Sequence, residues 1–127
     1  MDTVSVRYIV DDVEAAIAFY TNQLGFDLEL HPAPGFAMLS RGPLRLLLNA
    51  PGAGGAGQPS PDGEMPKPGG WNRIQLQIGD LDRTVDDLRA AGARFRNEIV
   101  TGQGGRQILV EDPAGNPVEL FEAAQNS

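Results

Sequence analysis

Apolar and polar residues alternate along residues 4–10 of the chain. This period of two predicts a β-strand whose apolar side, with Tyr8 and Val10, faces a core. The same alternation returns at residues 71–79, and shorter apolar runs between turn residues predict further strands. These further strands are expected at residues 27–31, 36–40, 44–49, 93–100, 106–111 and 117–123.

Two segments between these strands change to the period of an α-helix. The first has apolar residues at positions 13, 16, 17, 20 and 24, a spacing that places them on one helical face. The second has them at positions 81, 85 and 88. Asp and Gly residues are suited to begin and end such helices, respectively. The predicted N-caps are Asp12 and Asp80, and the predicted ends are Gly25 and Gly92.

The order of the predicted elements repeats along the chain, because a strand, a helix and three strands occur twice. The pattern predicts an α+β fold of two βαβββ modules, module one at residues 3–50 and module two at residues 71–123. Residues 51–70 are rich in Gly and Pro and are predicted to form a flexible linker or a surface loop. We expect residues 1–127 to form a single domain. With one helix on each sheet, the uncovered sheet faces are free to enclose a cavity.

Composition removes several classes of function. The chain has 127 residues and a net charge of −7, from 17 acidic and 10 basic residues, which argues against a nucleic-acid partner. It has no cysteine, which excludes disulfides, thiolate zinc sites and cysteine nucleophiles. No apolar run reaches the length of a membrane span, and the N-terminal residues lack a signal pattern. We therefore expect a cytoplasmic protein without a membrane partner.

The glycines of residues 52–57, GAGGAG, have the spacing of a dinucleotide-binding loop. In such loops the glycines open a helix whose N-terminus binds the pyrophosphate. Here the stretch QPSPDGEMPKPGG follows, and it cannot begin that helix. Nucleotide binding is therefore not expected.

Three segments, VDDVEAAIAFYTNQLGF, GGWNRIQLQIGDLD and DPAGNPVELF, resemble the vicinal oxygen chelate superfamily. This superfamily includes glyoxalases, bleomycin-resistance proteins and extradiol dioxygenases. The resemblance covers nearly the whole chain. It implies that the two βαβββ modules form a partly open barrel around a ligand-binding cavity, and that the protein is a homodimer that binds a small organic molecule.

The resemblance also implies a divalent metal ion held by residues of the first and last strand of each module. The matching positions in this chain are Ser5, Leu47, Arg73 and Glu119, and only Glu119 is an ordinary metal ligand. The single histidine, His31, lies outside these positions. Because a catalytic metal site needs about three protein donors, we expect no metal ion and no other cofactor.

Glu119 lies in the middle of a predicted strand, which leaves two interpretations open. It could be an exposed strand carboxylate, or it could form an ion pair that faces the cavity. Arg73, at another of the metal-ligand positions, could bind the carboxylate bidentately in place of the ion. We therefore expect Arg73 and Glu119 to pair.

Further candidate ligand-binding residues lie on the strand faces opposite the apolar ones. They are either solvated or part of a polar-lined pocket. The polar candidates are Arg7, Arg45, Asn49, Gln75 and Gln107. Ser5 and Leu47 are added because they occupy positions that match metal ligands of the superfamily. The apolar candidates, which could stack on a planar ligand or pack in the core, are Phe36, Met38, Trp71 and Phe121.

Three interpretations of the function remain. The first is a metal-free binding protein that sequesters a small organic molecule in the cavity, as the bleomycin-resistance branch does. The second is an enzyme, a lyase, isomerase or dioxygenase. In a metal-free form Glu119 would act as general base, with Arg73 or Arg45 stabilising negative charge. A metal-dependent form is the less favoured alternative, because the metal-ligand positions lack suitable residues. A domain of a larger complex, with its cavity filled by side chains, is a third reading.

Overall fold

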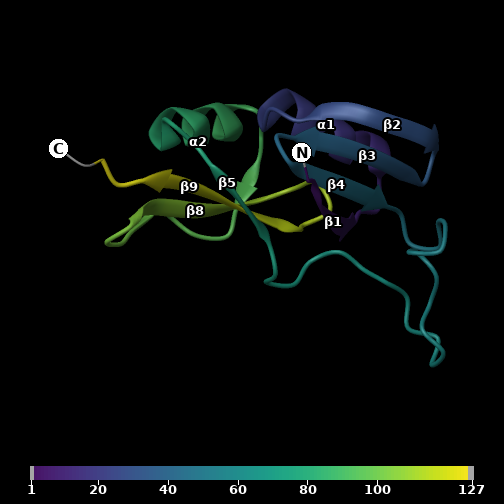
Figure 1. Cartoon of the computed structure of the whole chain (residues 1–127). Helices are drawn as coiled ribbons and strands as arrows, with labels where there is room; N and C mark the ends of the chain where they lie inside the picture. Colours follow the sequence, from purple (N-terminus) through teal and green to yellow (C-terminus); the bar gives the residue numbers. More distant parts are fainter. Residues whose placement is uncertain (1, 126–127) are drawn as a thin grey trace. The chain divides into compact units, whose positions relative to one another are not determined.

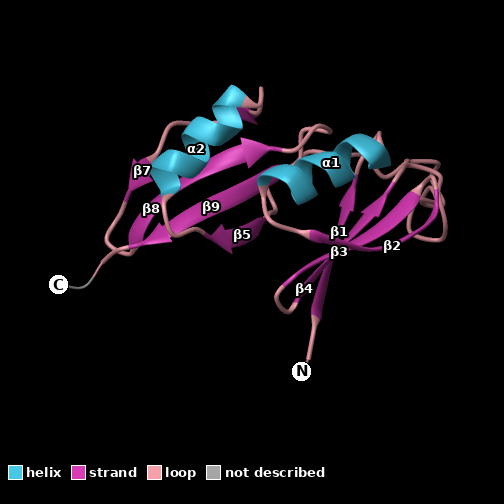
Figure 2. Ribbon diagram, turned by 90° about the horizontal axis from the view of Figure 1, so that it is seen from above, coloured by secondary structure: helices cyan, strands magenta, loops and turns pink. Residues whose placement is uncertain are grey.

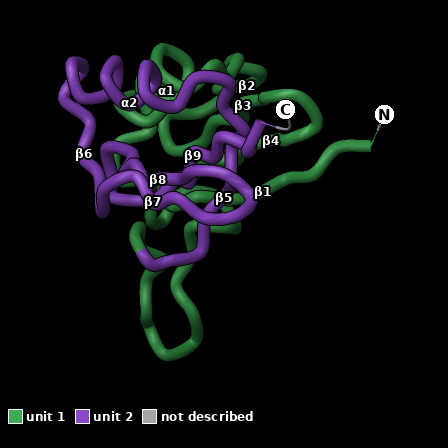
Figure 3. The backbone as a smooth tube through the Cα atoms, turned by 90° about the vertical axis from the view of Figure 1, so that its left-hand side faces the viewer, with its two compact units in different colours: residues 1–69 green, residues 70–127 purple. Residues whose placement is uncertain are grey.

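The computed structural model describes residues 2–125, which fall into two compact units. Unit one extends to residue 69 and unit two begins at residue 70 (Figure 3). Each unit has its own β-sheet and one α-helix (Figure 1), as the sequence pattern predicts for an α+β fold. Neither helix in this part of the chain has the length and hydropathy that crossing a bilayer requires.

Unit one contains a four-stranded sheet with the order β1-β4-β3-β2. Strand β1 is parallel to β4, and the other pairs are antiparallel. Helix α1 packs against β2, β3 and β4. The ring of Tyr20 on this helix contacts the ring of Phe26 edge-on, with 5.4 Å between the ring centroids. The elements are β1 (Val4–Ile9), α1 (Val13–Gln23), β2 (Asp27–Ala33), β3 (Phe36–Arg41) and β4 (Leu44–Asn49).

Unit two contains a sheet with the order β5-β9-β8-β6, and β7 also pairs with β8. Helix α2 packs against β9 (Figure 2). The core of unit two is formed by residues such as Val85, Ile108 and Leu120, which are at most 3% exposed. The elements are β5 (Ile74–Gln77), α2 (Leu81–Ala90), β6 (Arg94–Phe95), β7 (Val100–Thr101), β8 (Gly105–Glu111) and β9 (Pro117–Ala123).

The two units repeat the same strand register. Arg7 of β1 pairs with Leu47 of the parallel strand β4, and Gln75 of β5 pairs with Glu119 of the parallel strand β9. Leu47 and Glu119 therefore occupy equivalent positions, as the sequence repeat predicts.

The predicted helix boundaries are confirmed. The side-chain oxygen of Asp12 accepts a hydrogen bond from the Ala15 backbone N–H at 3.1 Å, and Asp80 does the same for Arg83 at 3.1 Å. After the helices, Gly25 and Gly92 have φ angles of 75° and 87°. Only glycine adopts this left-handed conformation without strain, which explains why both helices end there.

The prediction of one continuous strand at residues 93–100 is wrong. The structure has two short strands, β6 and β7, because residues 96–99 form no ladder pair with β8. The backbone N–H of Arg96 still donates to the Leu109 carbonyl at 3.0 Å. The side-chain oxygen of Asn97 accepts the Leu109 backbone N–H at 2.9 Å, which removes that N–H from ordinary strand pairing. The prediction that the apolar side of β1 faces a core is also wrong at the start of the strand, where Val4 is 62% exposed.

Residues 50–58 include the first part of the segment predicted as a flexible linker or a surface loop, and they form a hydrogen-bonded loop. The backbone N–H of Gly52 donates to the Gly57 carbonyl at 2.6 Å, and the Gly57 N–H donates to Ala53 at 3.0 Å. The Gln58 side chain donates to the carbonyls of Gly52 and Gly54 at 3.1 and 3.0 Å. The glycines of this segment thus allow a tight turn, a role that composition alone does not distinguish from flexibility.

Candidate functional site

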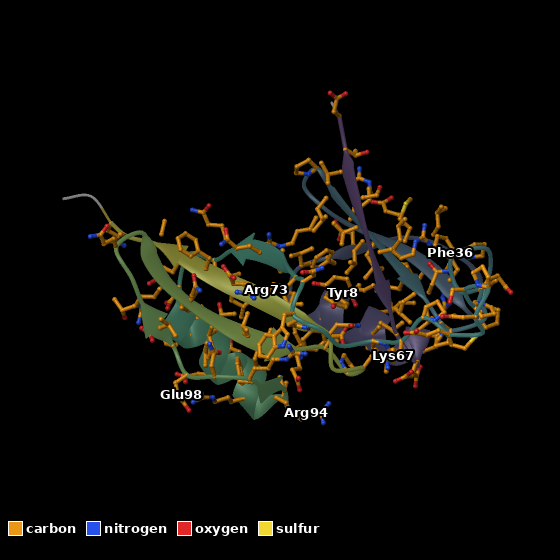
Figure 4. All side chains as sticks on the ribbon, turned by 90° about the horizontal axis from the view of Figure 1, so that it is seen from below. Tyr8, Phe36, Lys67, Arg73, Arg94 and Glu98 are labelled. Atoms are coloured by element: carbon orange, nitrogen blue, oxygen red, sulfur yellow. The ribbon has the colours of Figure 1, made fainter. Side chains whose placement is uncertain are left out.

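Glu119 lies on β9, between β5 and β8, and is only 8% exposed. Arg73, which precedes β5, donates from Nε and Nη2 to the Glu119 oxygen Oε1 at 3.0 and 2.9 Å. Gln75 donates from Nε2 to the other oxygen, Oε2, at 2.6 Å. The predicted pair of Arg73 (labelled in Figure 4) with Glu119 is therefore present. It is a charge-neutralised, three-donor arrangement and not an exposed carboxylate.

Trp71 adjoins this pair and exposes 68% of its surface. Its carbonyl accepts a hydrogen bond from Arg73 Nη1 at 3.3 Å, and its ring lies under the guanidinium of Arg96 at 4.7 Å. Arg96 is itself fixed by Glu111 at 2.9 Å and by the carbonyls of Gly70 and Gly115 at 2.5 and 2.9 Å. The indole is thus an exposed aromatic surface held in place by a cation–π contact.

The matching positions for a metal ion do not fit one. Ser5 offers a neutral hydroxyl, Leu47 has no donor, and Arg73 is a cation. Both oxygens of Glu119 already accept hydrogen bonds. Among residues 2–125, no three His, Cys, Asp or Glu side chains gather where an ion could bind. We therefore derive no chemistry through a metal ion.

A pocket of about 430 Å³ lies within unit one. It brings together three predicted site residues, Arg7, Phe36 (labelled in Figure 4) and Asn49. Arg7 Nη1 donates a short hydrogen bond to the side-chain oxygen of Asn49, and Asn49 Nδ2 donates to the Ala53 carbonyl at 3.3 Å. The remaining lining residues are Pro32, Ala33, Gly35, Ala53, Gly54, Gly55 and Ala56.

The other predicted site residues take different places. Ser5, Met38, Arg45 and Leu47 share the sheet face of Arg7 and Asn49 by strand alternation, but they do not line this pocket. The Arg45 guanidinium donates to the Gly42 and Leu44 carbonyls at the β3–β4 turn, at 2.9 and 3.1 Å.

In unit two, Gln107 of β8 pairs with Phe121 of β9. They lie on the sheet face of Glu119, because side chains two residues apart on a strand share a face. The hydrogen bonds of Glu119 go to Arg73 and Gln75 and not to these two residues, so the role of Gln107 and Phe121 in binding a ligand stays a prediction.

Sequence reasoning missed two parts of these sites. Arg96 was not singled out, because its role depends on the break between β6 and β7 that the strand pattern concealed. Residues 53–56 belong to the segment that the sequence predicts as a flexible linker or a surface loop, and the sequence does not indicate that they form a pocket wall. The spacing of small residues is compatible with a wall, but only the hydrogen bonds within the loop show that one forms.

Arg106 of β8 is the centre of a charged cluster in unit two. It contacts Asp82 at 3.0 Å and Glu122 at 2.7 Å. Hydrogen bonding to Arg106 lowers the pKa of Asp82. The pKa of Glu122 is lowered by the Leu81 backbone N–H, which it accepts at 2.9 Å, and then by Arg106. The cluster thereby fixes the start of α2 to β8 and β9.

The sequence profile of the Glyoxalase/Bleomycin resistance protein/Dioxygenase superfamily matches residues 3–120. The chain belongs to this superfamily. The match confirms the resemblance seen in the sequence. No curated protein matches the chain.

Three solved structures show how far the likeness extends. A superfamily member from Sphaerobacter thermophilus DSM 20745 is 28% identical, with 96% of this chain and 97% of that chain covered and a TM-score of 0.74. TnmS3, an antibiotic binding protein from Streptomyces sp. CB03234, is 23% identical, with 98% and 97% covered and a TM-score of 0.73. Lactoylglutathione lyase from Agrobacterium tumefaciens is 22% identical, with 94% and 91% covered and a TM-score of 0.72. The last two likenesses show the shared fold alone.

Proposed function

We propose that this superfamily member binds a small organic molecule without a metal ion and releases it chemically unchanged. The observation that carries the proposal is the ion pair between Arg73 and Glu119. These residues occupy both positions of unit two at which the superfamily resemblance implies metal ligands. The guanidinium neutralises the carboxylate, so a divalent ion is not needed for charge balance there.

The surroundings of the pair suit binding better than chemistry on the ligand. Glu119 already accepts three hydrogen bonds from Arg73 and Gln75, so its carboxylate is committed to protein partners. Trp71 supplies an exposed, fixed aromatic surface next to Arg73. An aromatic surface beside hydrogen-bonding groups is the usual composition of a small-molecule site.

The shared fold is compatible with this proposal but does not decide it. The same fold occurs in an antibiotic binding protein and in a lactoylglutathione lyase, so function depends on the residues of the site. The homodimer that the resemblance implies belongs to the same proposal. Light scattering coupled to size-exclusion chromatography would give twice the mass of the chain if it is right.

A ligand screen tests the proposal directly. Protein purified in the presence of a chelator would be screened against planar natural products by thermal shift, and the screen repeated with added Zn²⁺ or Mn²⁺. We expect compounds that raise the unfolding temperature equally in both conditions and are recovered unchanged, as judged by mass spectrometry. Binding that requires the metal, or conversion of the compound, would contradict the proposal.

The variant Glu119→Gln separates a binding protein from the enzyme alternative. Gln keeps the shape of the side chain but removes the carboxylate. A binding protein should retain affinity within about tenfold, the equivalent of one weakened hydrogen bond. If Glu119 instead acts as a general base, the variant binds the compound and loses its conversion.

A further inference from the structure

We propose that the pocket of unit one binds a small organic anion, with its acidic group at Arg7 and its flat apolar part along Phe36. This inference rests on the proposed small-molecule binding and adds a ligand class to it. The ligand class is a small aromatic carboxylate, or another compact anion on an apolar body.

Arg7 is a cation with a neutral partner. The Arg7 guanidinium donates a hydrogen bond to the Asn49 amide oxygen, and no carboxylate among the described residues of unit one forms a salt bridge with it. In unit two, by contrast, Arg73 and Arg96 each bind a carboxylate. The amide of Asn49 fixes the guanidinium without cancelling its charge, so the planar N–H fork stays able to bind an anion bidentately.

The rest of the pocket wall defines the body of the ligand. Arg7 is the only charged residue that lines it, and Phe36, Pro32 and small residues provide most of the remaining surface. At Gly54 and Gly55 no side chain stands between a ligand and the backbone. A volume of about 430 Å³ is within the range of pockets that hold small organic ligands.

The wall opposite the sheet is a built structure. A Cβ atom at Gly35 would lie 2.5 Å from the Ala53 Cβ, so the β2–β3 turn and the loop are in close contact. The Ala50 backbone N–H donates to the Gly35 carbonyl at 2.9 Å. Asn49, which is 3% exposed, binds Arg7 and the Ala53 carbonyl at once. The cation and the loop therefore hold a fixed geometry, which lowers the entropic cost of binding.

Two probes of nearly equal shape test the inference on the full chain. The anion 2-naphthoate and the uncharged 2-naphthamide would be titrated by calorimetry and by ¹⁵N NMR, with the wild type and the variants Arg7→Gln and Arg83→Gln. Arg83→Gln removes the same charge from the exposed surface of α2 and is the matched control. Dispersed NMR spectra establish that each variant is folded.

We expect the wild type and Arg83→Gln to bind naphthoate about tenfold more tightly than naphthamide, the effect of one charge-assisted contact. The backbone signals of residues 53–56 should shift during the titration. In Arg7→Gln the preference for the anion should disappear while naphthamide binding stays unchanged.

Several results would overturn the inference. They are equal binding of both probes to the wild type, an anion preference that survives in Arg7→Gln, and signal shifts that avoid residues 53–56. Absence of binding by both probes at millimolar concentration would overturn it as well. None of these results contradicts the proposal that the protein binds another compound without a metal ion. That proposal is contradicted only if the ligand screen shows that binding requires a metal ion or that the compound is converted.

Discussion

Arg73 donates two hydrogen bonds, at 3.0 and 2.9 Å, to a single carboxylate oxygen of Glu119. Arg73 immediately precedes β5, Glu119 lies on the neighbouring parallel strand β9, and the two residues are far apart in the sequence. Because Glu119 is nearly buried, its charge is tolerated only with such a partner. The ion pair therefore has two roles in our account. It stabilises unit two, and it is the basis for proposing that the protein needs no metal ion.

Replacing Arg73 by Ala should destabilise the protein by about 1–3 kcal/mol, because Glu119 is left with a buried, unpaired charge. Urea unfolding followed by circular dichroism measures the change. The double variant Arg73→Ala/Glu119→Gln should lose less stability than the sum of the two single variants, since the stranded charge is absent. A free energy of unfolding unchanged in Arg73→Ala would show that the pair carries no energetic role.

Arg96→Met should cost about 2 kcal/mol, because the nearly buried guanidinium binds Glu111, two backbone carbonyls and the ring of Trp71. The chain has one tryptophan, so fluorescence anisotropy reports on Trp71 alone and should fall in the variant. Arg89→Met is the matched control. Its guanidinium lies over Phe95 at 5.2 Å and forms an exposed pair with Glu98, so a change within about 0.5 kcal/mol is expected. Equal losses in the two variants would contradict the role of Arg96.

Gly57→Ala should destabilise the loop at residues 50–58. A Cβ atom there would lie 2.5 Å from the backbone N and O of Ala53, so the backbone must move, at a cost of about 1–3 kcal/mol. At Gly55 a Cβ atom meets nothing within 4 Å, and Gly55→Ala should change the free energy of unfolding by less than about 0.5 kcal/mol. Thermal unfolding of both variants measures the contrast, and equal values would mean that the loop is not packed as described.

Arg106→Gln should weaken the acid dependence of stability. In the folded protein Arg106 lowers the pKa of Asp82 and contributes to the lowered pKa of Glu122. A lowered carboxyl pKa contributes stability above about pH 4, and this contribution is lost as the pH falls further. The drop in unfolding temperature between about pH 7 and about pH 3 should therefore be smaller in the variant than in the wild type. An identical drop would contradict the prediction.

The sequence repeat was sufficient to predict most of the fold. The change from a period of two to a helical period located both helices, and the capping residues Asp12 and Asp80 set their starts. These features are readable because they depend on local chemistry and on alternation along a strand.

The remaining features depend on contacts that local patterns do not contain. The interruption at residues 96–99 arises from a side-chain hydrogen bond of Asn97 to Leu109 on another strand. The loop wall of the unit-one pocket depends on close contact between Gly35 and Ala53. Of the site itself, the ion pair of Arg73 with Glu119 was predicted, because the superfamily resemblance aligned two opposite charges.

Native mass spectrometry of freshly purified protein, without chelator or added metal, tests the central claim most directly. If the Arg73–Glu119 pair takes the place of a metal ion, the spectrum contains no divalent ion, and the protein is either empty or carries an organic adduct whose mass begins to identify the ligand. A spectrum with about one divalent ion per site would contradict the account and indicate a metalloenzyme.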